Sequence, residues 1–154
     1  MERFGRRLLA AIEDRSAGAF VADTAPIIYR VTRGPDKQFV AACDPLFDAV
    51  EDDELGCIVS AASLAELLIE PFRAGPAAVS AIDAFLRQRA IGIAEVDEVI
   101  ARTAAELLAS RRLNRLSSAV VGATALCYSI PVVTGDRVLA RGLGGAALLV
   151  ADYR

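Results

Sequence analysis

Short, uninterrupted apolar segments alternate along this chain with longer segments in which apolar residues recur every three or four positions. Parallel strands buried on both faces are apolar throughout, and the connections between them are usually helices. The alternation therefore indicates an open α/β fold, in which a parallel sheet of four to five strands is covered by helices on both faces. We predict strands at residues 19–22, 56–60, 90–96, 131–134 and 147–151.

Helices are predicted from the spacing of apolar residues between these strands. Two prolines are expected to disturb them, because proline lacks the backbone N–H that a helix interior requires. Pro45 is predicted to interrupt a helix over 39–54, and Pro71 to end a helix over 63–70. The other helices are expected from Pro26 onward and at 77–89, 97–113 and 117–128.

Length and composition exclude several classes of protein. The 154 residues are enough for one domain with a sizeable core and too few for two ordinary ones. The absence of histidine excludes His-based triads and His–metal motifs, and the only lysine, Lys37, does not belong to a phosphate-binding loop. A net charge of −3 argues against a general polyanion binder, although it allows a local basic patch.

The cysteines and the longest apolar run bear on location. Cys43, Cys57 and Cys127 are odd in number, widely spaced and set among apolar residues, which is typical of buried thiols in the reducing cytoplasm. The uncharged run from Leu116 to Gly135 contains a proline and several hydroxyl side chains. We interpret it as a buried helix followed by a buried strand, and expect a cytoplasmic protein that does not contact the membrane.

Three acidic residues follow predicted strands. Asp23 is the last residue of the segment VAD, and Asp136 is the last residue of VVTGD. Glu66 lies six residues beyond Ser60, in the next predicted helix. Ligands of open α/β sheets bind beyond the carboxyl ends of the strands. Carboxylates gathered there are suited to Mg²⁺ or Mn²⁺, which can polarise a phosphodiester and activate water without a histidine.

Each acid also has a purely structural interpretation. Asp23 can cap the helix that begins near Pro26, and Asp136 can cap the short turn that follows it. Ser63 and Glu66 have the spacing of a capping box, in which the Glu side chain reaches back to the Ser backbone. Taken singly, each cap is as reasonable as a ligand, but three acids at one sheet edge favour a site.

Three segments together resemble the PIN domain, and most of all the VapC toxins of bacterial toxin–antitoxin pairs. VADTAPIIY and CIVSAASLAELL carry the first two acids, and RLSSAVVGATALCYSIPVVTGD is similar in spacing to the family pattern for the last two. The resemblance runs from about Val21 to Val150. It implies a three-layer α/β/α sandwich and a metal-dependent endoribonuclease, neutralised by a cognate antitoxin protein.

The resemblance also assigns site residues. Asp23, Glu66 and Asp136 match the first, second and fourth family acids and would hold Mg²⁺ or Mn²⁺. Thr24 and Thr134 stand where family hydroxyls support the site. The third acid should fall 18 residues before Asp136, and this chain has Ser118 there.

The serine at position 118 leaves two functions open. It can cap a helix as aspartate would, but it lacks the charge with which a carboxylate attracts a dication by several kcal/mol at an effective dielectric of about 20. One ion on the remaining three acids is possible, and a second is harder to hold. The first hypothesis is a toxin ribonuclease that hydrolyses RNA with metal-activated water. The alternative is a catalytically degenerate PIN domain that binds RNA or protein, and the serine is either natural or a deliberate inactivation.

Arginines near these acids are candidate contacts for RNA phosphates, because arginine matches phosphate geometry and an acidic protein needs local positive charge to bind RNA. Four are predicted from their positions beside Ser118 and Asp136, namely Arg111, Arg112, Arg115 and Arg137. Arg30 and Arg33 have less support, and Tyr29 either stacks on a base or is buried in the core or in an interface. All of these arginines can equally be solvated surface residues.

The first 20 residues are predicted to be an N-terminal helical extension, followed by a single PIN-like domain over 21–154. Phe4, Leu8 and Ile12 lie four positions apart, which predicts an amphipathic helix over 3–14. This apolar stripe either packs on the domain or is buried in a homodimer, the assembly that we expect.

Overall fold

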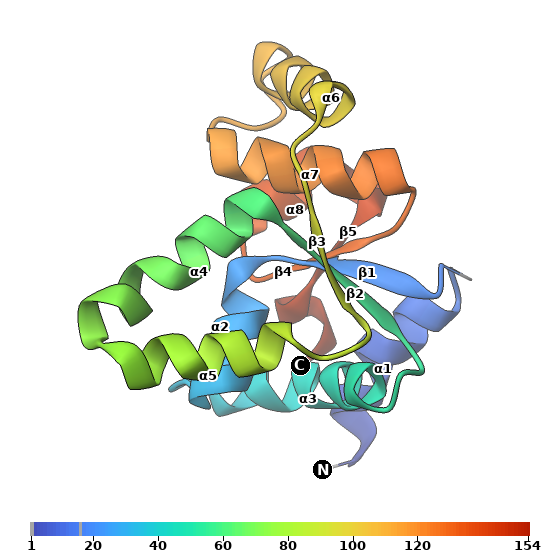
Figure 1. The fold of residues 1–154 in the computed structure, drawn as a ribbon. Helices are drawn as coiled ribbons and strands as arrows, with labels where there is room; N and C mark the ends of the chain where they lie inside the picture. Colours follow the sequence, from blue (N-terminus) through green and yellow to red (C-terminus); the bar gives the residue numbers. More distant parts are fainter. Residues whose placement is uncertain (1, 16) are drawn as a thin grey trace.

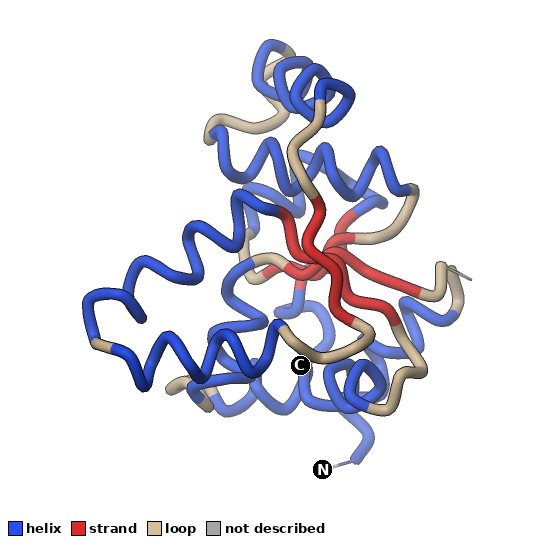
Figure 2. The backbone as a smooth tube through the Cα atoms, viewed as in Figure 1, coloured by secondary structure: helices blue, strands red, loops and turns tan. Residues whose placement is uncertain are grey.

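The predicted strands form one parallel sheet. The computed structural model describes residues 2–15 and 17–154, except for the side chains of residues 2–5. The strand order is β3-β2-β1-β4-β5, so β1 lies at the centre, between β2 and β4 (Figure 2). In register, Phe20 of β1 pairs with Cys57 of β2, and Val21 of β1 pairs with Val132 of β4. The strands are β1 Ala19–Ala22, β2 Gly56–Ser60, β3 Ile91–Ala94, β4 Val132–Thr134 and β5 Ala147–Leu149.

Helices cover both faces of the sheet, as predicted. One layer contains α1 Glu2–Glu13, α2 Thr24–Thr32, α3 Lys37–Glu51 and α5 Pro76–Leu86, with the 3₁₀ helix η2 Val150–Tyr153. The other contains α6 Glu98–Ala109, α7 Leu116–Tyr128 and α8 Arg137–Leu143, followed by η1 Gly144–Ala146. Figure 1 shows the two layers below and above the sheet, with α4 Ala61–Ala74 leading away from the end of β2. The three-layer α/β/α sandwich is therefore confirmed.

Alternation along the strands explains why both faces need cover. On β1, Phe20 and Ala22 belong to the core beneath α1, α2 and α3, whereas Val21 belongs to the core beneath α6, α7 and α8. The same alternation places Val133 of β4 in the first core and Val132 in the second. Successive side chains of a strand point to opposite faces, so a strand that is apolar at every position must be buried on both.

The N-terminal helix packs on its own chain. Leu8 and Ile12 of α1 are fully buried, in the same core as residues of α3. Their burial within one chain makes them unavailable to a dimer, so of the two alternatives for this stripe the intramolecular one is correct for these residues. The side chain of Phe4, the third member of the stripe, lies outside the described part of the structure.

The two prolines do not act as predicted. Pro45 lies inside a continuous α3, and Pro71 lies inside α4, which continues to Ala74. In α3, buried residues on both sides of the proline, such as Cys43 and Phe47, hold the two turns against the core. Tertiary packing therefore compensates for the one backbone hydrogen bond that a proline removes. α4 ends instead at Gly75, whose φ of 121° lies outside the helical range.

The cysteine prediction is correct for two residues of three. Cys43 and Cys57 are buried, and burial raises the pKa of each thiol to about 12. Cys127 is exposed, because it lies on the solvent side of α7. No helix in the described ranges is both long and apolar enough to cross a membrane, so the apolar run from 116 to 135 is α7 followed by β4.

Candidate active site

Asp23 occupies the junction between β1 and α2. Its backbone is extended, and its Oδ1 accepts a hydrogen bond from the Thr24 backbone N–H at 2.9 Å, which makes it the N-cap of α2. Its second oxygen, Oδ2, accepts a hydrogen bond of 2.7 Å from the hydroxyl of Thr134, at the end of β4. The capping interpretation is thus correct for this residue, and its second oxygen also links the end of β1 to the end of β4.

Glu66 is brought to Asp23 by the way α4 begins. The N-cap is Ser60, whose Oγ accepts from the Ala62 N–H, so the predicted capping box of Ser63 and Glu66 does not form. The helix starts at Ala61, which leaves Ser63 buried in the first turn and turns Glu66 toward α2. The Thr24 hydroxyl lies 3.3 Å from Glu66 Oε2 and 3.2 Å from Asp23 Oδ1, and so bridges the two carboxylates.

Asp136 combines a cap with a link to the other acids. Its Oδ1 accepts from the backbone N–H groups of Val138, at 2.8 Å, and Leu139, at 3.4 Å, which caps α8. Its own N–H donates to the Thr134 hydroxyl at 2.9 Å. Because Thr134 in turn donates to Asp23, hydrogen bonds connect Asp136, Asp23 and Glu66 through two threonines. These are the two threonines that the sequence assigned to support of the site.

A pocket of about 320 Å³ contains all three acids, at the edge where β1, β2 and β4 end. It is lined by Asp23, Thr24, Ala25, Glu66, Arg115, Ser117, Ser118, Val121, Gly135 and Asp136. Four of these, Ala25, Ser117, Val121 and Gly135, were not among the predicted site residues. Of these, Gly135 could have been found from the sequence, because it lies between the predicted strand and Asp136 in the segment VVTGD. A Cβ at this position would lie 2.9 Å from the ring of Phe39, which would have to shift.

Ser118 lines this pocket from α7 but does not cap that helix. α7 begins at Leu116, its N-cap is Arg115, and no side chain makes a cap hydrogen bond there. Ser118 is therefore in the first turn, and the prediction that it replaces aspartate as a cap is wrong. What it contributes to the pocket is a neutral hydroxyl.

The donors in the pocket are chemically suited to a hard dication, since carboxylate and hydroxyl oxygens are the ligands that Mg²⁺ and Mn²⁺ prefer. Asp23 and Glu66, bridged by Thr24, would hold such an ion most directly. Asp136 directs one oxygen to the start of α8. Across residues 2–15 and 17–154, no three acidic or cysteine side chains are grouped closely enough to hold an ion as they stand.

The four candidate arginines lie in three different places on the structure. Arg115 lines the acid pocket, with Nη2 at 3.8 Å from Glu66 Oε1, a longer ion pair exposed to solvent. Arg111 and Arg112 lie beyond the end of α6 and line a second pocket instead, because α6 stops at Ala109 and not at 113 as predicted. Arg137 is exposed on the first turn of α8 and lines neither pocket.

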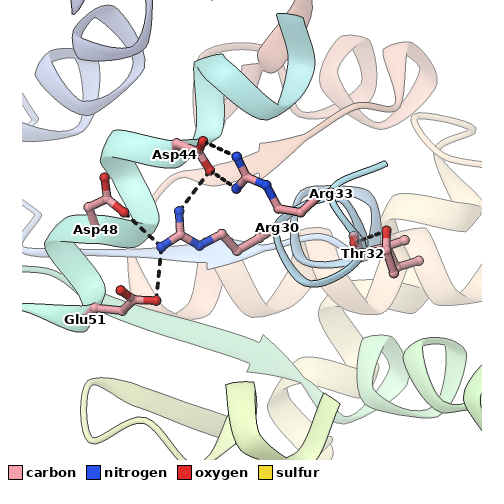
Figure 3. A network of polar contacts seen from close by, with 7 residues as sticks. Arg30, Thr32, Arg33, Asp44, Asp48 and Glu51 are labelled. Atoms are coloured by element: carbon pink, nitrogen blue, oxygen red, sulfur yellow. Dashed lines mark hydrogen bonds and ion pairs between the residues drawn. The ribbon is translucent and has the colours of Figure 1, made fainter. Parts of the chain in front are cut away.

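Arg30 and Arg33 are paired with carboxylates of the same chain. Figure 3 shows the guanidinium groups of Arg30 in α2 and of Arg33, the residue that follows α2, directed at carboxylates of α3. Arg30 pairs with Asp44 and Asp48 at 2.8 Å and with Glu51 at 3.0 Å, and Arg33 pairs with Asp44 at 2.7 Å. Burial alone would lower the pKa of Arg30, but the hydrogen bonds that it donates to the three carboxylates raise it, so it remains a cation.

Tyr29 is likewise used within the fold. Its ring makes an edge contact with Phe39 of α3, with ring centroids 4.6 Å apart, and the side chain is half-buried. Tyr29 is therefore a partly buried residue that packs against the core beneath α2 and α3.

Comparison with known proteins agrees with this architecture. A model of the PIN domain family matches residues 20–142, which is most of the chain. The chain belongs to the PIN domain family. The fold of this PIN domain is similar to one in the crystal structure of VapBC2 from Rickettsia felis bound to a DNA fragment from their promoter, with a TM-score of 0.64 and 18% sequence identity. The alignment covers 85% of this PIN domain and 96% of that chain. No curated protein sequence matches it.

Proposed function

We propose that this PIN domain is a metal-dependent endoribonuclease, the toxin of a toxin–antitoxin pair, and that it hydrolyses RNA phosphodiesters. The observation that carries the proposal is the convergence of Asp23, Glu66 and Asp136 on one pocket at the carboxyl edge of the sheet. These residues are separated by 43 and 70 positions in the chain, so their meeting is a property of the fold.

The proposed cofactor is Mg²⁺ or Mn²⁺, held by Asp23 and Glu66 with Asp136 nearby. When bound, such an ion supplies Lewis acidity toward a phosphodiester and lowers the pKa of water. The Thr24 hydroxyl bridges the first two carboxylates. The Thr134 hydroxyl connects Asp23 to the backbone N–H of Asp136. Arg115 is the residue placed to orient the phosphate that enters the pocket, because its guanidinium lies at the rim beside Glu66.

Two partners follow from this proposal. The first is a cognate antitoxin, which would silence the enzyme by covering the acid pocket. The similarity to VapBC2, a complex crystallised on a DNA fragment from their promoter, supports this partner. We further propose that the protein works in the cytoplasm as a homodimer, which must use surfaces other than the buried face of α1 that carries Leu8 and Ile12.

The second candidate function is a catalytically degenerate PIN domain that binds RNA or protein. Ser118 favours it, because a hydroxyl in place of a carboxylate removes one of the four family charges from the pocket. The absence, within the described residues, of three acids grouped for a metal favours it as well.

Calorimetric titration with Mn²⁺ separates the two functions. Three proteins are compared, the wild type, Ser118→Asp and Asp23→Asn, the last as the control that removes a proposed ligand. A ribonuclease requires wild-type binding that Asp23→Asn weakens at least tenfold and that Ser118→Asp strengthens. Binding by Ser118→Asp alone supports the degenerate domain, and binding by none of the three rejects the metal site.

Cleavage is then tested on total RNA with Mn²⁺, comparing the wild type with Asp23→Asn. Loss of a proposed ligand should abolish cleavage. Cleavage that persists in Asp23→Asn comes from a contaminating nuclease and removes support for the proposal.

A further inference from the structure

A second pocket, of about 590 Å³, lies between the loop that follows α6 and the helix α8. Three of the residues that line it are exposed arginines: Arg111 and Arg112 from the loop and Arg141 from α8. No acidic residue lines it. We call it the arginine pocket.

The arginines of this pocket are not neutralised within the chain. Among residues 6–15 and 17–154, whose side chains are described, none of the three lies within ion-pair distance of a carboxylate. Arg112 uses only its Nε, which donates to the Gly142 carbonyl at 2.9 Å. Its two terminal nitrogens are therefore left for a ligand.

The wall of the pocket is firmly built. Gly142 packs so closely on the loop that a Cβ added to it would lie 2.4 Å from the carbonyl oxygen of Arg112. Arg111 has a left-handed backbone, with φ of 58°, and its N–H donates to the Leu108 carbonyl at 3.0 Å. Loop and helix are thus attached to each other, and the arginines are presented from a defined backbone.

The arginine pocket adjoins the acid pocket. Val138 lines it, and the N–H of that residue donates to Asp136 of the acid pocket. On the other side, the loop passes from Arg112 to Arg115 within three residues, and Arg115 lines the acid pocket. The loop after α6 and the start of α8 therefore border both pockets.

We propose that the arginine pocket binds the backbone phosphates of single-stranded RNA next to the phosphate that enters the acid pocket. The inference rests on the proposed ribonuclease function and extends it to a second phosphate subsite, with Arg141 as a new contact. A polyanion that approaches three carboxylates is repelled unless unpaired cations lie close by. Arginine forks bind phosphate oxygens in pairs, and this binding needs no metal.

The test measures RNA binding without catalysis. A fluorescein-labelled single-stranded RNA of about 12 nucleotides, within the usual site size of such proteins, is titrated in EDTA and followed by fluorescence anisotropy. The test variant is Arg111→Gln with Arg141→Gln. The matched control is Arg73→Gln with Arg89→Gln, which removes the same charge from exposed positions that line neither pocket. Urea unfolding of both variants verifies that they fold.

The salt dependence of binding gives the decisive readout. Each lost phosphate contact should reduce the slope of log K against log salt by about 0.7 for a single strand, so the test variant should lose about 1.4. Its affinity at low salt should fall at least tenfold, while the control keeps the wild-type slope. Equal losses in the two variants would show a net-charge effect and overturn the proposal.

Two further outcomes keep the proposals separate. If the wild type cleaves RNA but the test variant binds RNA with an unchanged slope, the arginine pocket fails and the ribonuclease stands. If the slope falls as expected but no RNA is cleaved under any metal condition, the ribonuclease fails and the phosphate subsite stands. A poly-glutamate peptide that binds the pocket more tightly than the RNA would assign it to an acidic protein and overturn the inference.

Discussion

Two groups of arginines in this molecule behave oppositely. Arg30 of α2 and Arg33 at its end pair with three carboxylates of α3, whereas Arg111, Arg112 and Arg141 have no such partners among the described side chains and share an open pocket. The residue type is the same in both groups. The difference is that α3 presents carboxylates to the first group, whereas no acidic residue lines the pocket of the second. The partners of an arginine, and not the number of arginines, therefore decide how much of its charge is neutralised within the chain.

The difference has a local origin in the sequence. Asp44, Asp48 and Glu51 are four and three positions apart, which places them on one face of α3, opposite α2. In contrast, the loop segment SRRLNRL at 110–116 and the helix segment RVLARGL at 137–143 contain no acidic residue. The second group of arginines therefore has no acid within its own segments to pair with.

Removing Arg30 should cause the largest loss of stability. Its side chain is only 15% exposed and holds three carboxylates, so Arg30→Ala leaves Asp48 and Glu51 without this cation and Asp44 with Arg33 alone. We expect the free energy of unfolding to fall by about 2 kcal/mol, below the 3–5 kcal/mol of fully buried pairs. Urea denaturation measures it, with Arg73→Ala as control, since the pair of Arg73 with Glu70 is exposed and should contribute less than about 0.5 kcal/mol. Equal effects of the two variants would erase the distinction between paired and surface arginines.

Adding charge to the acid pocket should have the next largest effect. Ser118→Asp brings a fourth carboxylate into the pocket that contains Asp23, Glu66 and Asp136. Repulsion between like charges should destabilise the metal-free protein by about 1 kcal/mol. Thermal unfolding with and without Mn²⁺ checks this, and the ion should raise the melting temperature of Ser118→Asp more than that of the wild type. A variant that is more stable without metal would show that the carboxylates do not interact.

Acid should weaken the paired cluster by a smaller amount. Partial burial alone would raise the pKa of Asp44, but hydrogen bonds from Arg33 and Arg30 lower it below its ordinary value of 3.8. A carboxyl whose pKa is depressed by folding stabilises the fold above its unfolded pKa, and this contribution is lost as the pH falls through the folded pKa.

The wild type should therefore be more stable than Arg33→Gln at neutral pH. The difference should shrink as the pH is lowered below about 4, and urea midpoints at several pH values measure it. A difference that stays constant down to pH 2 would mean that Arg33 does not lower the pKa of Asp44.

The smallest effect is expected at the arginine pocket. Arg141 is exposed and unpaired among the described residues, so Arg141→Gln removes no interaction of the folded chain. The free energy of unfolding should change by less than about 0.5 kcal/mol, as for surface substitutions in general. A larger loss of stability in urea denaturation would show that Arg141 has a structural role, as Arg30 has.

The sequence predicted the sheet and the three acids because both depend on simple local patterns. Apolar runs specify the strands, and an acid directly after a strand, as at Asp23 and Asp136, lies at the carboxyl edge whatever surrounds it. What failed depended on tertiary packing. Pro45 is tolerated because a core lies beneath α3, and the start of α4 at Ser60 decides where Glu66 points.

The partners of the arginines were beyond prediction for the same reason. Nothing local to Arg30 shows that Asp44 and Glu51 lie opposite, since that requires the packing of α2 on α3. Similarly, α6 ends four residues earlier than its apolar pattern suggested, and this places Arg111 and Arg112 in a loop.

The position of β4 has a consequence for translation. Asp23 and Glu66 are synthesised early, but the strand that carries Thr134 and leads to Asp136 is among the last to be made. A nascent or stalled chain without β4 has two of the carboxylates and lacks the neighbour that completes the centre of the sheet. The acid pocket can therefore form only on a nearly complete chain, and a polypeptide still attached to the ribosome lacks it.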